Sequence, residues 1–141
     1  CIRNDIGTLI VGYNTTFQRS SDLGRRMNQV FVGIPFGILR RKLKYLCEMN
    51  GIRYVEQEES YTSMASFWDL DEMPVYGEAG LVPPVFSGRR ICRGLYQEHS
   101  GRRINADVNG ALNIMRKCNI VSLRALYARG DVDTPVRIRI A

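Results

Sequence analysis

The sequence predicts an α/β fold, because a strand, a helix and a second strand follow one another near its start. Residues 5–13 form a β-branched, apolar run bounded by glycine, which is typical of a buried strand. Residues 35–51 open on proline, close on glycine and repeat apolar residues at helical spacing. Residues 52–56 alternate as a strand does. This order favours parallel pairing of the two strands.

The predicted helix has one apolar face, which we expect to be core while its basic residues point outward. The apolar members are Phe36, Leu39, Leu43, Leu46 and Cys47, and the outward ones Arg40, Arg41 and Lys44. Beyond the second strand, residues 61–88 predict an irregular insert. Residues 90–96 and 102–104 predict two paired strands with a turn near residues 99–101. A last helix is expected over residues 121–128, and residues 134–141 are either an edge strand or loose.

Composition limits the class of protein. With 141 residues and 45% hydrophobic content, the chain is one ordinary folded domain at most. No window resembles a membrane span, so nothing in the sequence suggests a membrane protein, and no secretory signal appears at its start. The chain opens on Cys1 without an initiator Met, which predicts a piece of something longer. Four scattered cysteines and one histidine favour reduced, mostly structural thiols, so we expect a cytoplasmic protein.

The net charge of +6 suits a phosphate-backbone partner. Any single basic group is more often a solvated face than a binding site, but the five groups together favour nucleic acid. These groups are Arg25-Arg26, Arg40-Arg41-Lys42 with Lys44, Arg89-Arg90 with Arg93, Arg102-Arg103, and Arg116-Lys117.

The segment of residues 104–114 is the most informative one. Asn105 is a natural N-cap, and it places Asp107 in the first turn of a helix beside small and amide-bearing residues. A carboxylate on such a rigid element can serve as an oxygen ligand for a divalent metal. The alternative is that Asp107 only stabilises its own helix start. Glu58 and Glu59 lie past the second strand, at the end where ligand sites of α/β sheets gather.

The order of these elements, with Tyr61-Thr62-Ser63 and the motif from Asp107 to Ile114, resembles the C-terminal half of the TnpB family. These are transposon-encoded RNA-guided nucleases, often labelled OrfB transposases and related to type V CRISPR effectors. The resemblance implies a partial RNase H-like (RuvC) fold: residues 1–60 as part of the core, 61–104 as a zinc-ribbon-like insert, 105–118 as the catalytic helix and 119–141 as a tail. It also implies two-metal hydrolysis of phosphodiesters with Mg²⁺, for which Asp107 matches the third catalytic carboxylate.

The chain departs from the family pattern at two places. Gly12 or a neighbour stands where the second carboxylate is usual, and Glu59, three residues before Thr62, matches a replacement similar to that of Fanzor proteins. Glu58 is a near competitor, and a solvated turn is the alternative for both. The four positions of the zinc ligands fall on residues that are neither Cys nor His, so zinc is not expected. We expect ordinary packing to hold the insert instead, by Phe67, Trp68, Tyr76, Leu95 and Tyr96.

Two functions follow from the resemblance. The first is part of a TnpB-like DNA endonuclease acting in transposition and DNA recombination, with Asp107 and Glu59 as Mg²⁺ ligands. Its partners are DNA, a guide RNA and the remainder of a longer protein, which holds the first catalytic Asp, so this chain alone is not expected to cut. The second is a nuclease-dead or decayed relative that acts only as an RNA- and DNA-binding module. The residues expected to hold nucleic acid are Arg89, Arg90, Arg93, Arg102 and Arg103.

Overall fold

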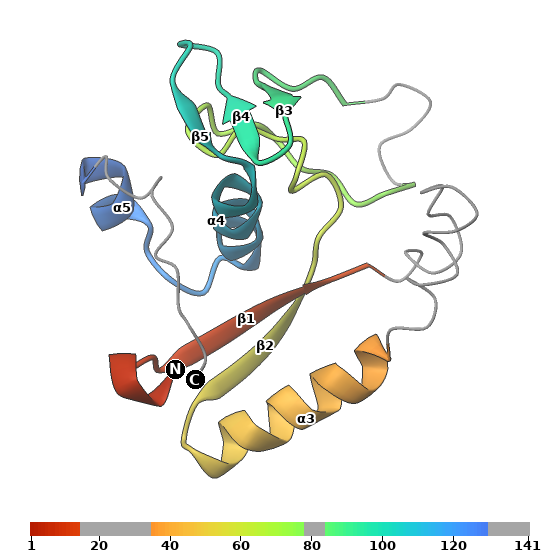
Figure 1. Ribbon diagram of the computed structural model, residues 1–141, viewed down its shortest axis with the longest axis vertical. Coiled ribbons are helices and arrows are strands. Elements are labelled where there is room, and N and C mark those ends of the chain that lie inside the picture. The colour runs from red at the N-terminus through yellow and green to blue at the C-terminus, as the bar shows by residue number, and fades with distance from the viewer. Residues whose placement is uncertain (15–34, 78–83, 130–141) are drawn as a thin grey trace. The chain divides into compact units, whose positions relative to one another are not determined.

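The computed structural model describes residues 1–14, 35–77 and 84–129, and the chain divides into two compact units, Cys1–Glu58 and Glu59–Ala141. Both units combine helix and strand, which confirms the α/β class (Figure 1). In this part of the chain no helix has the length and apolar content to cross a membrane. The basic pair at residues 25–26 and the tail from residue 134 lie outside the described residues.

The first unit is built on a parallel pair of strands. Its elements are the 3-10 turn η1 (Ile2–Asn4), strand β1 (Thr8–Tyr13), helix α3 (Phe36–Met49) and strand β2 (Arg53–Glu58). The strands pair in parallel from Thr8 opposite Arg53 to Tyr13 opposite Glu58, as the sequence predicts. Strand β1 begins later than residue 5, because Asp5 takes a left-handed conformation that ends η1.

The predicted core face of α3 is confirmed only in part. Cys47 is buried and Phe36 and Leu43 are half-buried, whereas Leu39 and Leu46 are 48% and 53% exposed. A pair of strands about 5 Å apart gives a helix too narrow a surface to cover a full apolar stripe. Arg40, expected to point outward, instead binds Glu56 of β2 at 3.1 Å.

The second unit packs helix α4 against a three-stranded antiparallel sheet of order β3-β4-β5. Its elements are β3 (Arg89–Cys92), β4 (Leu95–Gln97), β5 (Arg103–Asn105), α4 (Ala106–Cys118) and α5 (Arg124–Arg129). The predicted pairing across a turn near residues 99–101 is confirmed by β4 and β5. The run 90–96 is not one strand but two, because Gly94 turns the chain with a φ of 78°.

The core of the second unit joins the insert to both helices. Phe67, Tyr96, Ile104, Ala106 and Leu112 are buried together. The ring of Tyr127 from α5 stacks on Phe67 with centroids 4.9 Å apart, and Trp68 packs edge-on against both rings.

Two expectations about side chains in this unit and beyond it are wrong. Tyr76 is not core but 68% exposed, and its ring lies 6.0 Å from that of Tyr61. All four cysteines are free, as expected, but only Cys47 is buried and Cys118 half-buried, whereas Cys1 and Cys92 are exposed, which does not fit a structural role.

Candidate functional site

Helix α4 begins at a complete side-chain cap. The Oδ1 of Asn105 accepts hydrogen bonds from the main-chain N–H groups of Asp107, at 2.9 Å, and Val108, at 3.1 Å. Asn105 itself is extended, as an N-cap residue should be. The helix start is therefore satisfied without the Asp107 carboxylate, which remains available for other contacts.

Asp107 presents its carboxylate to the surface. Its side chain is 89% exposed, and Oδ1 lies 3.9 Å from Nη2 of Arg90, which is itself half exposed. An exposed ion pair at that distance contributes little to stability. The structure thus holds this carboxylate on a rigid element, beside a cation, with no structural task beyond the charge it places at the helix N-terminus.

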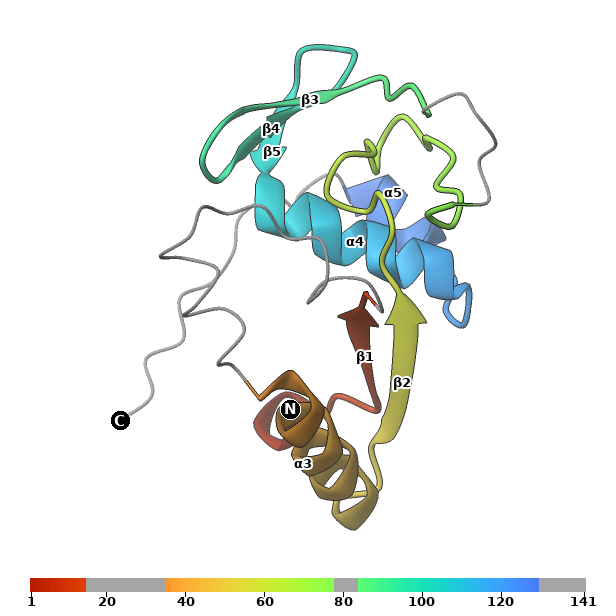
Figure 2. The same cartoon turned by 90° about the vertical axis from the view of Figure 1, so that its right-hand side faces the viewer.

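Two asparagines of the same motif, Asn109 and Asn113, are fully buried, in contrast to the exposed Asp107. Asn109 donates to the carbonyl of Ala65 at 2.8 Å and accepts from the N–H of Phe67 at 3.1 Å. Asn113 donates to the carbonyls of Thr62, at 3.0 Å, and Ala65, at 2.7 Å. Figure 2 shows the start of the insert running along α4, and the hydrogen bonds of the two amides hold it there. The spacing i, i+4 places both asparagines on one side of the helix, but the sequence alone did not reveal this role.

The same contacts show where Glu59 lies. Lys117 donates to the carbonyl of Ser60 at 3.2 Å, so the segment after Glu59 runs along α4 from its C-terminal half toward its start. About 9 Å of helix separates Asp107 from Asn113, the residue opposite Thr62. Glu59 and Asp107 therefore lie toward opposite ends of α4.

Glu58 is the last residue of β2 and belongs to the first unit. Within residues 1–14, 35–77 and 84–129, no group of three or more His, Cys, Asp or Glu side chains is placed to hold a metal ion.

The five predicted nucleic-acid-binding arginines fall into four settings. Arg89 and Arg103 stand opposite Gln97 from either side, so the three form a row across one face of the sheet. Arg90 pairs with Tyr96 and belongs to the other face, toward Asp107.

The remaining two arginines differ sharply from each other. Arg93 is exposed between β3 and β4. The guanidinium of Arg102 lies 4.4 Å from the centre of the Trp68 ring, and its Nε lies 3.6 Å from Oε1 of Glu98. Arg102 is thus engaged inside the unit.

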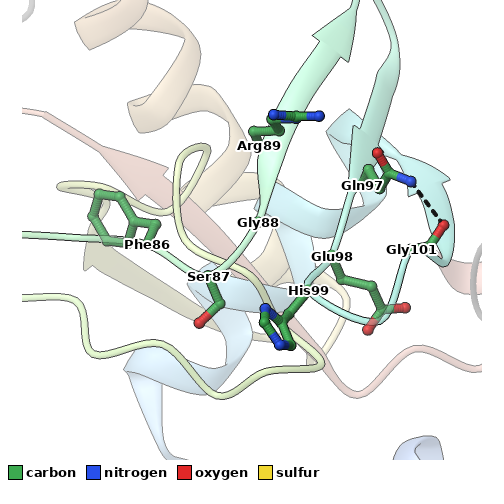
Figure 3. Close-up of a pocket in the computed structure, with 8 residues that line it drawn as sticks. All are labelled: Phe86, Ser87, Gly88, Arg89, Gln97, Glu98, His99 and Gly101. Carbon is green, nitrogen blue, oxygen red and sulfur yellow. Dashed lines mark hydrogen bonds between the residues drawn. The ribbon is translucent and has the colours of Figure 1, made fainter.

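A hollow of about 450 Å³ opens beside Arg89 (Figure 3). It is lined by Phe86, Ser87, Gly88, Arg89, Gln97, Glu98, His99 and Gly101. Guanidinium, amide, imidazole and hydroxyl groups can all hydrogen-bond a phosphate or a base edge. Burial, with the charge of Asp69, raises the pKa of Glu98, while Arg102 opposes the shift.

Gly88 in the wall of this hollow is a residue that the sequence did not single out. A Cβ at that position would lie 2.6 Å from the ring of Tyr96 and 2.7 Å from the carbonyl of Gln97. Only glycine fits there, because both contacts are far shorter than van der Waals distance. The local sequence carries no signal of this contact, since Tyr96 comes from another strand.

Basic residues gathered on one face of a sheet are an electrostatic feature common to proteins that bind nucleic acid. The sequence matches the family described as Cas12f1-like, TNB domain, over residues 36–114. The match covers more than half of the chain and includes α3, β2, the three-stranded sheet and most of α4, and the chain belongs to this family. It is thereby related to TnpB and Cas12-type RNA-guided nucleases. No curated protein matches the sequence.

Proposed function

We propose that this chain is part of a TnpB-like, RNA-guided DNA endonuclease in which Asp107 supplies a metal-binding carboxylate. The observation that carries the proposal is the exposure of that carboxylate, 89%, on a helix start that Asn105 already caps. Family membership supports it, because the match includes Asp107. The resemblance of the motif from Asp107 to Ile114 to that of TnpB proteins implies that Asp107 is a catalytic carboxylate of a RuvC-type nuclease.

Asp107 is chemically suited to Mg²⁺, which prefers carboxylate oxygens and keeps several waters. Two bound Mg²⁺ ions would activate a water and stabilise the leaving oxygen of a phosphodiester. The described residues lack a complete ligand set. Glu59, with Glu58 as its competitor, is the proposed second carboxylate, and a further carboxylate would come from the rest of a longer protein.

Nucleic-acid binding is proposed for the arginine row of Arg89 and Arg103, together with Arg93 at the hairpin. Their guanidinium groups are exposed and can contact successive phosphates of DNA or of a guide RNA. The hollow beside Arg89 adds hydrogen-bonding groups and the ring of Phe86, on which a base can stack. Arg102 contributes less, because Trp68 and Glu98 already engage it.

A second function, a binding module without nuclease activity, is favoured by a different observation. The main chain next to Glu59 lies toward the C-terminal half of α4, whereas Asp107 is at its start, so the two proposed ligands are attached to the fold at separate places. Reconstituting the longer protein with guide RNA and target DNA distinguishes the two. Mg²⁺-dependent cleavage supports the endonuclease, and binding without cleavage supports the module.

The arginine row can be tested by salt dependence. Replacing Arg89 and Arg103 together with Ala should weaken DNA binding and reduce the slope of log affinity against log salt by about 2, because each lost phosphate contact removes about one released counterion. The matched control is the double replacement of Lys42 and Lys44, which removes the same charge from α3. If both doubles change the slope equally, the row has no special role.

A further inference from the structure

We propose that two carboxylates stabilise the insert where the family resemblance implies zinc: Asp71 closes the first of its two turns, and Asp69 links that turn to the second. The first turn comprises residues 66–71 and the second comprises residues 97–102. The inference concerns how the second unit folds, and it does not depend on the proposed nuclease activity.

The residues at the four ligand positions do not fit zinc. These positions are Ser66, Asp69, Gln97 and Ser100, and none offers a thiolate or an imidazole. Three of the four side chains are bound to nearby main chain. Ser66 Oγ accepts from the N–H of Asp69 at 3.3 Å, Ser100 Oγ accepts from that of Arg102 at 3.4 Å, and Gln97 donates to the carbonyl of Gly101 at 3.0 Å.

Asp71 closes the first turn and ties it to a third segment. Its Oδ2 accepts from the N–H of Ser66 at 2.8 Å, while its own N–H donates to the carbonyl of Ser66 at 3.2 Å. The same carboxylate accepts from both the N–H and the hydroxyl of Ser87, beside the hollow. Ser66 is fully buried, so its N–H needs this acceptor. One carboxylate therefore fixes two segments that lie 16 residues apart along the chain.

Asp69 makes the link between the two turns. Its Oδ2 accepts from the N–H of His99 at 3.0 Å, across 30 residues of sequence. Beside this bond, the guanidinium of Arg102 from the second turn stacks on the ring of Trp68 from the first. A cation over an aromatic ring and a charge-assisted hydrogen bond thus connect the same two turns.

This arrangement supplies negative charge and a cross-link at the place of the expected metal. Hydrogen bonds from main-chain N–H groups to a carboxylate are stronger than those between neutral groups. They need no metal ion. The fold of the second unit should therefore be insensitive to chelators, unlike a structural zinc site, whose binding energy is folding energy.

The first test measures metal content and melting temperature on the full chain. Trp68 is the only tryptophan and lies against the core of the second unit, so its fluorescence reports the melting of that unit. We expect the purified protein to contain substoichiometric zinc, well below one ion per chain. We also expect the same melting temperature with EDTA, with added zinc and without either addition. Stoichiometric zinc together with a lower melting temperature in EDTA would overturn the proposal.

The second test uses Asp71→Ala and Asp69→Ala, which remove the acceptor oxygens, with Glu72→Ala as a matched control on an exposed neighbour. We expect each aspartate variant to lower the melting temperature by about 5 °C or more, and the control to leave it unchanged. The ¹H–¹⁵N spectrum adds a specific readout, because Asp69→Ala should shift the amide proton of His99. If Asp71→Ala does not fold, Asp69→Ala carries the test. An unchanged melting temperature and an unshifted His99 amide would refute the role of Asp69.

Discussion

Replacing Asn109 with Ala should destabilise the second unit strongly, although Asn109 lies two residues from an exposed carboxylate. The amide is fully buried and makes hydrogen bonds with Ala65 and Phe67. Their loss costs about 1 kcal/mol each, and the N–H of Phe67, left without this acceptor, adds about 1 kcal/mol more. The carbonyl of Ala65 keeps its bond from Asn113 at 2.7 Å, so it adds no further cost. The sum is about 3 kcal/mol.

Two variants at neighbouring positions of α4 are compared with Asn109→Ala. Asn113→Ala also loses two hydrogen bonds, but it removes an Oδ1 that is buried without a hydrogen-bond partner, so we expect a smaller loss of about 1–2 kcal/mol. Asp107→Ala should cost less than about 1 kcal/mol, because the exposed carboxylate contributes only its favourable charge at the helix N-terminus.

The assay is urea denaturation of the full chain, followed by the fluorescence of Trp68. At an unchanged slope, the midpoint gives the change in the free energy of unfolding. A cost below about 1 kcal/mol for Asn109→Ala would refute the reasoning, because two buried hydrogen bonds cannot be lost so cheaply. So would an equal cost for Asp107→Ala, since the two residues would then share one structural role.

Three further outcomes are expected. Burial, with the charge of Asp69, raises the pKa of Glu98 in the folded protein. The protonated Glu98 carboxyl therefore favours the folded state below pH 4.5, the ordinary pKa, and this stabilisation is lost as the pH rises through the pKa of the folded state. Glu98→Gln should therefore raise the melting temperature at pH 7 and give no gain at pH 4. Asn105→Ala should cost about 1 kcal/mol in urea denaturation, because two N–H groups lose their cap. Burial raises the pKa of the Tyr96 phenol to about 12, so stability should fall above pH 10 in the parent chain, and this fall should be smaller in Tyr96→Phe.

Sequence reasoning succeeded where local signals determine structure. The parallel pair β1–β2 and the start of α4 at Asn105 were predicted correctly, because alternation, glycine punctuation and an N-cap act within a few residues. The position of Asp107 on the first turn also follows from its distance to that cap.

Burial was harder to predict, because it depends on what else the chain brings near. Leu39 and Leu46 have the spacing of a core face, but they remain exposed, because among the described residues α3 packs against a single pair of strands. Tyr76 was expected in the core, and Tyr127 from the last helix stacks on Phe67 instead. Neither outcome has a signal in the local sequence.

The candidate site could be predicted only in part for the same reason. The sequence singled out Asp107, Glu58 and Glu59 as carboxylates, but not the distance that α4 sets between Glu59 and Asp107. That distance follows from the hydrogen bonds of Asn109 and Asn113, which join residues more than 40 positions apart. Long-range contacts of this kind appear only when the chain is folded.

The most direct test of the central claim, that Asp107 is presented for metal chemistry while its neighbours build the fold, is the cleavage rate of the longer protein carrying Asp107→Ala. The protein is assembled with guide RNA, target DNA and Mg²⁺, and DNA binding and melting temperature are measured on the same sample. We predict a loss of cleavage of at least about 100-fold, the scale of removing a charge-stabilising group from an active site, with binding retained and melting nearly unchanged. Unchanged cleavage would contradict the claim.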